Sequence, residues 1–243
     1  MKSTKKMGLK RIILSLLFLS VVNIQAFTQK ADHFHSWWVY DGNFRLHDRL
    51  SVNALYAWSR NDYVKNWQQS LTRIGLNYDH RKNLAFSGGY EWIERFPYGE
   101  QPLPRQIAIH RFYQGITLKN KIGNIGLANI LRFNQEHLNG AFRYFIINQI
   151  ELKIPVRLNK KNTRLSIRLA EAIFINHGKS ANKNYFGQNR VYAGIDVLVN
   201  QSMGIDVGYL NQYIIKGNQL IENNHTLLVR LTHQMDVRKN RRH

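Results

Sequence analysis

Hydrophobic and polar residues alternate along most of the chain with a period of two. Within residues 189–213, Val191 and Ile195 share one parity, whereas Asp196 has the other. Successive side chains of a β-strand point to opposite faces of a sheet, so this pattern predicts a strand with one apolar face and one polar face. The alternation resumes after a short polar segment, which predicts a second strand joined to the first by a tight turn.

The same alternation recurs along the whole chain. Most repeats are about 11 to 15 residues long, against roughly 5–6 for a strand in a soluble sheet and roughly 9–11 for a tilted strand that crosses a bilayer. These lengths favour strands that cross a membrane. The predicted strands lie at residues 34–46, 50–60, 67–79, 83–95, 107–119, 124–136, 142–154, 163–177, 188–199, 203–215 and 222–234.

Two classes of protein use such strands. A soluble β-sandwich or lipocalin-like binder turns its apolar faces toward a core, whereas a transmembrane barrel turns them toward lipid. In lipid every backbone N–H and C=O must be satisfied internally, so the sheet has to close. We predict an all-β fold, a closed antiparallel up-and-down transmembrane β-barrel of about 10–12 strands. A soluble periplasmic β-sheet binding protein remains the alternative.

The predicted strand number is odd, whereas bacterial single-chain barrels have even numbers. We therefore expect that one strand is missed or split, near 27–46 or in the turn after Pro155, so that the barrel has ten or twelve. The connections alternate between short, such as "NQS", and longer, such as "NHGKSANKNYFG", as expected for periplasmic turns and external loops. The aromatic residues predicted to form girdles at the membrane interfaces are Trp37, Trp38, Tyr56, Trp58, Tyr90, Trp92, Tyr209 and Tyr213.

The N-terminus reads "MKSTKKMGLKR" and then "IILSLLFLSVVNIQA". A basic stretch, an apolar run shorter than the roughly 20 residues of a spanning helix, and small residues near Ala26 predict a secretory signal peptide at 1–26. The barrel is then expected at 27–236 and a basic C-terminal tail at 237–243. This organisation predicts export to the bacterial outer membrane. The expected partners are outer-membrane lipid, lipopolysaccharide and the barrel assembly machinery.

The chain is strongly basic, with a formal net charge of +20, and contains no cysteine. A basic balance of this size is typical of proteins that bind nucleic acid, of anionic lipid surfaces, and of basic pore linings. The export signal argues against nucleic acid, and the basic residues are spread through the alternating segments rather than gathered in one patch. The absence of cysteine fits an exported protein that does not depend on disulfides.

The residues resemble a known family, the domain-of-unknown-function 2490 family of Bacteroidetes-type outer-membrane β-barrels. The resemblance covers about residues 33 to 235 and rests on the order of several segments. The family implies an outer-membrane address and a barrel fold, and it implies no activity. The segments are "RIGLNYDHRKNLAFSGGYEW", "HRFYQGITLKNKIGNIGLANILRFNQE", "EAIFIN" and "NRVYAGIDVLVNQSMGIDVGYLNQ".

The polar parity predicts which side chains face the lumen. Charges inside a narrow barrel must pair or be hydrated, because an unpaired charge in a low-dielectric interior is very costly. We therefore expect an Arg/Glu network that plugs and braces the lumen, or a narrow porin-like pore whose arginines favour anions. The residues predicted to form this lumen network are Arg132, Glu136, Arg143, Glu151, Arg164, Arg168, Glu171, Arg190, Asp196, Asp206, Gln212 and Arg230.

Glu171 is an exception to the parity, because it falls on the apolar face of its strand with Leu165 and Ile167. A β-bulge near Ala170 would turn Glu171 inward, and we predict that bulge. Several glycines within the strands are expected to make room for large neighbours or bends rather than to contact a ligand. These are Gly75, Gly88, Gly89, Gly194 and Gly208.

Catalytic and metal signals are weak. His33 and His35 have the i, i+2 spacing of a metal pair on a strand, but they lie beside the predicted mature terminus, so no metal and no cofactor are predicted. A lipid hydrolase requires a Ser–His pair, for which Ser87 and His110 are the candidates. The sequence thus favours a non-enzymatic barrel, structural or narrowly porous. An outer-membrane enzyme acting on lipid or lipopolysaccharide is the alternative, and the oligomeric state is open.

Overall fold

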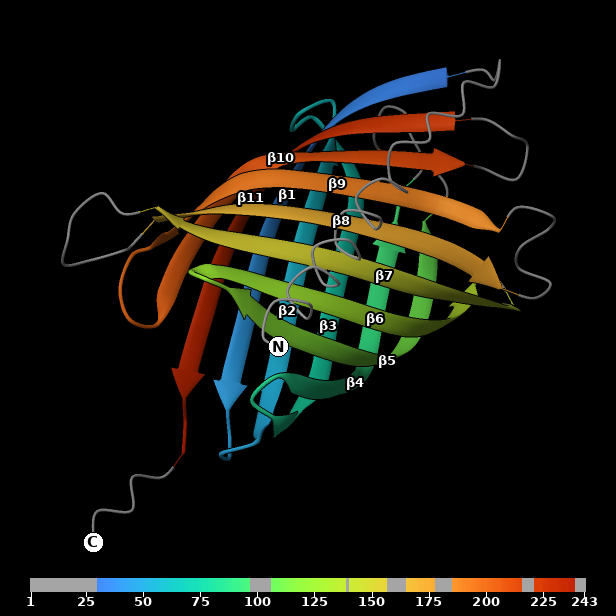
Figure 1. The fold of residues 1–243 in the computed structure, drawn as a ribbon. Coiled ribbons are helices and arrows are strands. Elements are labelled where there is room, and N and C mark those ends of the chain that lie inside the picture. The colour runs from blue at the N-terminus through green and yellow to red at the C-terminus, as the bar shows by residue number, and fades with distance from the viewer. Residues whose placement is uncertain are drawn as a thin grey trace, which may run out of the picture.

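The strands form one closed barrel in the computed structural model (Figure 1). The structure describes residues 30–96, 106–138, 140–156, 165–177, 185–215 and 221–238. The predicted signal peptide at 1–26 and most of the predicted tail at 237–243 lie outside these ranges. No helix among the described residues is long and apolar enough to cross a membrane.

Eleven strands of 12 to 16 residues follow one another in the barrel wall. Each overlaps one of the segments that the alternation predicts. Their bounds are β1 Lys30–Arg45, β2 Leu50–Asn61, β3 Asn66–Arg81, β4 Leu84–Arg95, β5 Ile107–Ile122, β6 Ile125–Leu138, β7 Ala141–Val156, β8 Leu165–His177, β9 Phe186–Leu198, β10 Met203–Ile215 and β11 Ile221–Asp236.

The structure confirms the predicted closed barrel of about 10–12 strands, but the expected even number is wrong, because the described part of the chain closes with eleven. Consecutive strands alternate in direction, so with an odd number the first and last strands run the same way and can pair only in parallel. β1 and β11 do so over their full length, from Lys30 opposite Ile221 to Arg45 opposite Asp236. Figure 1 shows the two arrows side by side and pointing in the same direction. All other neighbours are antiparallel.

The barrel closes with a stagger between its strands. Following paired residues once around the wall from Arg45 through β2 to β11 leads back to Ala31, fourteen residues earlier on β1. A stagger of this kind accompanies the tilt that a closed sheet requires. Because the offset is even, every residue keeps its face after a full circuit.

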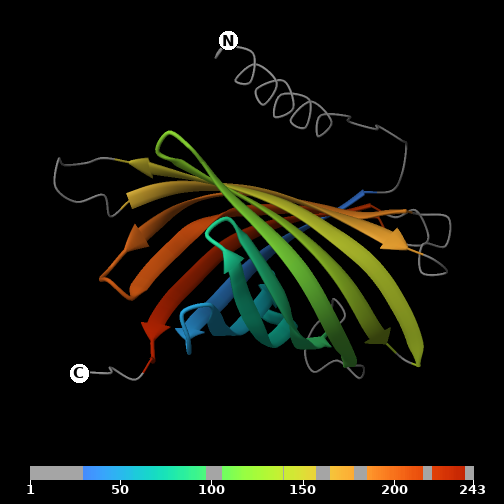
Figure 2. The same cartoon turned by 60° about the horizontal axis from the view of Figure 1, so that its bottom comes forward.

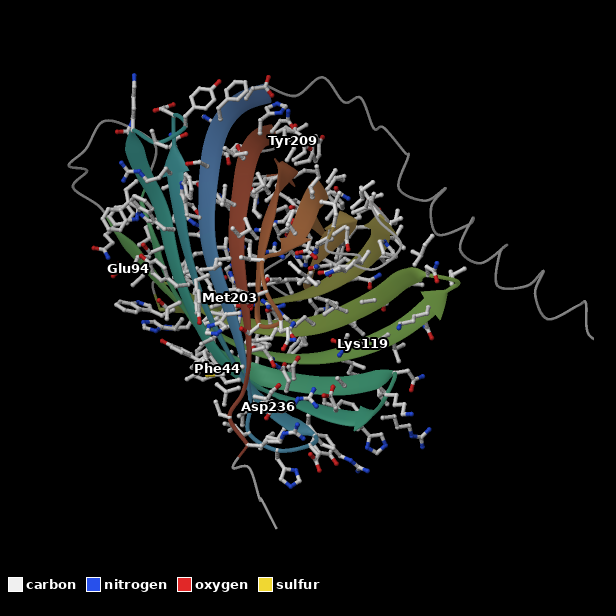
Figure 3. All side chains as sticks on the ribbon, turned by 90° about the vertical axis from the view of Figure 1, so that its left-hand side faces the viewer. Phe44, Glu94, Lys119, Met203, Tyr209 and Asp236 are labelled. Carbon is white, nitrogen blue, oxygen red and sulfur yellow. The ribbon has the colours of Figure 1, made fainter. Side chains whose placement is uncertain are left out.

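The two faces of the wall differ sharply, and side chains occupy both (Figure 3). The outward parity carries exposed apolar residues such as Ile74 at 59%, Ile195 at 52% and Leu227 at 51%. The inward parity carries buried polar residues such as Glu91 and Asp206, both at 0%. The distribution is therefore inverted relative to a soluble protein. Of the predicted girdle residues, Trp37 is wrong, because it faces inward and packs against the buried residues Tyr192, Leu210 and Leu228.

The two ends of the barrel chain lie at opposite rims (Figure 2). β1 starts at the rim where β2 meets β3, and β11 ends at the rim where β1 meets β2. At the latter rim Arg238 donates hydrogen bonds to Asp48 in the β1–β2 turn and to Asp236. These two carboxylates raise the pKa of Arg238 above its ordinary value.

Candidate functional site

The lumen contains a cluster of ion pairs centred on Glu91 of β4. Three arginines from three other strands reach this fully buried carboxylate: Arg73 of β3 at 2.7 Å, Arg111 of β5 at 2.6 Å and Arg132 of β6 at 2.9 Å. The strands deliver them together because all four residues have inward parity and their strands are neighbours. A carboxylate out of water needs such partners, since burial alone would cost several kcal/mol.

Two glycines in the barrel wall make room for a tyrosine that packs beside this cluster. Gly75 and Gly89 are paired across β3 and β4, and a Cβ on either would meet the hydroxyl of Tyr113. The tyrosine ring therefore lies over the glycine pair, as the sequence predicted when it assigned these glycines to packing. The guanidinium carbons of Arg73 and Arg132 lie 5.6 and 4.6 Å from the centre of that ring, within the range of cation–π contacts.

A second carboxylate extends the cluster toward the end of β6. Arg111 bridges Glu91 to Glu136, which it contacts at 2.5 Å, and Arg143 of β7 reaches the other oxygen of Glu136 at 3.4 Å. Arg132 also donates to Asn134 at 3.0 Å. This first cluster consists of Arg73, Glu91, Arg111, Arg132, Glu136 and Arg143.

The second cluster is centred on Asp206 of β10, also fully buried. Its carboxylate is 3.0 Å from Arg168 of β8 and 3.5 Å from Arg230 of β11, and it accepts a hydrogen bond from the hydroxyl of Tyr192. Tyr192 lies over a second cross-strand glycine pair, where a Cβ on Gly208 would be 2.6 Å from its hydroxyl.

The second cluster continues along β7 and β9. Arg168 also contacts Glu151 at 3.1 Å, and Lys153 forms an ion pair with Asp196. The charges here balance, since Arg168, Lys153 and Arg230 face Glu151, Asp196 and Asp206. The first cluster is different, because its four arginines face two carboxylates.

Arg190 of β9 has inward parity and aromatic neighbours. Its guanidinium carbon is 4.6 Å from the ring centre of Phe174 and 5.4 Å from that of Trp37. Its only hydrogen bond recorded in the described part of the chain is a long one to Gln188, at 3.5 Å. The buried Gln212 sits opposite Arg190 on β10.

The family described as "Protein of unknown function (DUF2490)" matches residues 34–222, which is most of the chain. The chain belongs to the DUF2490 family. This result agrees with the resemblance found in the sequence, while the family match itself carries no organism and no cellular address.

No curated protein matches the DUF2490 chain. Among solved structures, the chain is similar to that of the siderophore receptor PirA from Pseudomonas aeruginosa, at 10% sequence identity and a TM-score of 0.27. The alignment covers 70% of the chain and 32% of the receptor, so the chain spans about a third of that protein's length.

Most residues predicted for the lumen network of the DUF2490 chain lie in these two clusters. Arg132, Glu136 and Arg143 are in the first, whereas Glu151 is in the second. Arg164 lies outside the described residues. The remaining members of the second cluster that the sequence predicted are Arg168, Asp196, Asp206 and Arg230.

The bulge predicted near Ala170 is wrong, and Glu171 faces outward. The pairing of β7 with β8 runs without interruption through Ile150 opposite Glu171, and the one irregularity of β8 against β9 comes later, at Phe174. The side chain of Glu171 is only partly buried and accepts a hydrogen bond from Asn189 at 2.9 Å. One oxygen of the Glu171 carboxylate is therefore satisfied by a hydrogen bond on the outer face, and no bulge turns the side chain inward.

Several important residues were missing from the sequence-based set. Glu91 is the centre of the first cluster, and Arg73 and Arg111 are two of its partners. The signal was present in the parity, since Glu91 alternates with Tyr90 and Trp92 in "GGYEWIE". Two tyrosines, Tyr113 and Tyr192, were also missing from this set.

The candidate Ser–His pair is not assembled. Ser87 has inward parity, whereas His110 has outward parity and is hydrogen-bonded to the hydroxyl of Tyr90 at 2.6 Å. Within the described ranges there is also no group of three or more His, Cys, Asp or Glu side chains that could hold a metal ion.

Proposed function

We propose that this DUF2490 chain is an integral outer-membrane barrel that acts as a non-enzymatic scaffold, with a lumen closed by its two ion-pair clusters. The observation that carries this proposal is the inverted distribution of side chains. Fully buried carboxylates line the inside, and large apolar side chains are exposed all around the outside. A wall of this kind is stable where hydrocarbon, not water, contacts its outer face.

The dimensions of the wall support the same placement. Strands of 12 to 16 residues exceed the roughly 9–11 that a tilted strand needs to cross a bilayer. Closure leaves no unpaired sheet edge, which is the requirement for backbone in lipid. A soluble binder would expose this extensive apolar surface to water, and such patches are rare on soluble monomers.

The lumen clusters support a scaffold rather than an open channel. Glu91 joins three strands through its arginines, and Asp206 joins two others. Wide porins keep a water-filled interior, whereas small barrels fill theirs with side chains. The proposed partners are outer-membrane lipid, lipopolysaccharide and the barrel assembly machinery.

A narrow passage that favours anions is the second candidate, and the composition of the first cluster supports it. Arg73, Arg111, Arg132 and Arg143 outnumber Glu91 and Glu136. Arg190 adds a further cation that is held by rings rather than by a carboxylate. Clustered arginines in a pore favour anions over cations.

Gel migration and planar-bilayer recording test these proposals in sequence. Protein extracted from the outer-membrane fraction should migrate differently before and after boiling, as folded barrels do. In a planar bilayer the scaffold predicts no steady conductance. A steady anion-selective conductance would select the second candidate instead. Release of the protein by salt without detergent, with migration unchanged by boiling, would overturn the membrane placement itself.

A further inference from the structure

The outer wall carries a strip of polar residues near the middle of strands β5, β7 and β8. Each strand has one outward-facing residue nearest its middle, and on eight of the eleven strands that residue is apolar or aromatic. The exceptions are Gln114 on β5, Asn148 on β7 and Glu171 on β8. The eight others are Trp38, Tyr56, Ile74, Tyr90, Leu131, Val191, Tyr209 and Val229.

Two hydrogen bonds on the outer face belong to this strip. Asn129 of β6 donates to Asn148 at 2.9 Å, and Asn189 of β9 donates to Glu171 at 2.9 Å. Each bond uses one polar atom of the acceptor, so the amide donor of Asn148 and the second oxygen of Glu171 remain available on the surface. Hydrocarbon offers no partner for either group, and ionisable residues at this depth are rare unless they have a function.

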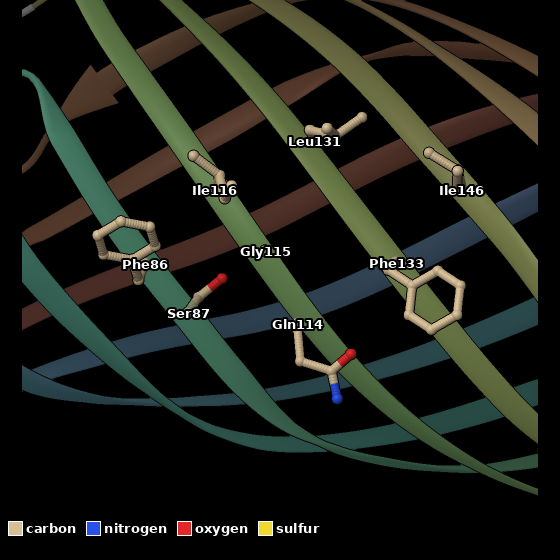
Figure 4. A pocket seen from close by; sticks show the side chains of 8 residues that line it. All are labelled: Phe86, Ser87, Gln114, Gly115, Ile116, Leu131, Phe133 and Ile146. Atoms are coloured by element: carbon tan, nitrogen blue, oxygen red, sulfur yellow. The ribbon is translucent and has the colours of Figure 1, made fainter.

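The wall is also hollowed beside the strip. A groove of about 390 Å³ lies over β4 to β7 (Figure 4). Gly88 faces outward there and is paired with Gln114, so the wall lacks a side chain at that point. Fluid lipid requires no such shape, whereas a rigid protein surface can fill it. The residues that line the groove are Phe86, Ser87, Gln114, Gly115, Ile116, Leu131, Phe133 and Ile146.

We propose that this face, from β4 to β9, is the contact surface for a second copy of the same chain within the membrane. The strip is self-complementary, because it presents an amide donor on Asn148 beside a carboxylate acceptor on Glu171. A twofold axis through the strip places each donor opposite the other copy's acceptor, as isologous interfaces do. The inference rests on the proposed membrane placement.

Single cysteines provide the test, because the chain has none of its own. Ile150 faces outward opposite Glu171, so Ile150→Cys places a thiol in the centre of the proposed interface. Val207 faces outward on β10 and is the matched control. Oxidation of outer-membrane fractions should give a covalent dimer of Ile150→Cys and none of Val207→Cys.

A second pair of variants separates the polar strip from the surrounding apolar wall. In the Ile150→Cys background, Asn148→Leu with Glu171→Leu should abolish the covalent dimer, whereas Val207→Leu with Val229→Leu, on β10 and β11 outside the proposed face, should retain it. Leucine is compatible with a wall that faces lipid, so each variant should still fold into a barrel whose gel migration changes on boiling.

Three outcomes would overturn the dimer proposal. They are the absence of any cross-link with Ile150→Cys, an equal yield with Val207→Cys, and a cross-link to a different membrane protein only. If the membrane placement itself were wrong, boiling would not change the gel migration of any variant. A change of migration on boiling in all variants therefore shows that only the dimer proposal has failed.

Discussion

At the scale of the residue, two glutamates of the same barrel have opposite environments. Glu91 is completely buried among three arginines, whereas Glu171 lies on the outer face with one amide partner. Removing one member of a buried ion-pair group leaves the others uncompensated, which is more costly than losing an exposed pair. Replacing Glu91 is therefore expected to destabilise the lumen network more than replacing any other of its residues.

We predict that Glu91→Gln lowers the free energy of unfolding by about 3–5 kcal/mol, because three buried arginines lose their shared carboxylate. Urea unfolding of the lipid-reconstituted barrel, followed by tryptophan fluorescence, measures this change. Glu94→Gln on the outward parity of the same strand is the control and should change stability by less than about 0.5 kcal/mol. Equal effects of the two variants would contradict the central role given to Glu91.

The sequence predicted which face of the wall a residue occupies more accurately than it predicted which residues it contacts. Parity alone places Arg132, Glu136 and Asp206 inward, and that is where they lie. It could not show that Glu91 gathers three strands, because which inward residues share a level depends on the stagger between strands. Nor could it show that Glu171 stays outside, because a single hydrogen bond to Asn189 on the next strand decides the point.

At the scale of the element, the strands are joined by inward tyrosines that lie over paired glycines. Tyr113 covers Gly75 and Gly89, and Tyr192 covers the pair that includes Gly208. Because the glycines have no side chains, each tyrosine can extend across its glycine pair, where Tyr113 contacts Arg132 and Tyr192 donates a hydrogen bond to Asp206. Glycine inside a strand otherwise weakens it, so this close approach is the compensating gain.

We predict that Gly208→Ala destabilises the barrel by about 1–3 kcal/mol, because its Cβ would collide with Tyr192 and with backbone of β9. Gly88→Ala is the matched control. It lies in a strand too, but its Cβ would meet nothing closer than 3.6 Å. The urea midpoints of the two variants give the comparison, and a loss as large for Gly88→Ala would show that the tyrosine contact is not the cause.

The strand pairing that closes the barrel could not be predicted from the sequence. Alternation located all eleven strands, but it carries no information about which strand pairs with which across a closure. The general preference for even numbers then led to ten or twelve. The parallel pairing of β1 with β11 removes the need for a further strand, because it satisfies the free edges of both.

At the scale of the whole molecule, an odd strand number places the two ends of the barrel at opposite rims. Lys30 starts at the rim that also holds the β2–β3 connection. Asp236 ends at the rim that holds the β9–β10 turn around Gln201. Even-stranded barrels have both ends on one side, so this arrangement distinguishes the chain from them.

We predict opposite accessibility for tags at the two rims. An epitope inserted after Val64, in the β2–β3 connection, should bind antibody on intact cells. Epitopes after Gln201 and after Val237 should bind only once the outer membrane is permeabilised. Permeabilised cells serve as the control for expression, because all three tags should then bind. Equal exposure of the Val64 and Gln201 tags on intact cells would be incompatible with the strand order.

A spin label on a single cysteine tests most directly whether the outward-facing apolar side chains contact lipid. Val207, exposed on the outer face of β10, and Gln201, in the turn beyond it, are the two positions. In reconstituted membranes the account predicts that the label at 207 collides frequently with dissolved oxygen and rarely with a water-soluble nickel complex, while the label at 201 does the reverse. Nickel collisions at 207 as frequent as those at 201 would contradict the membrane placement.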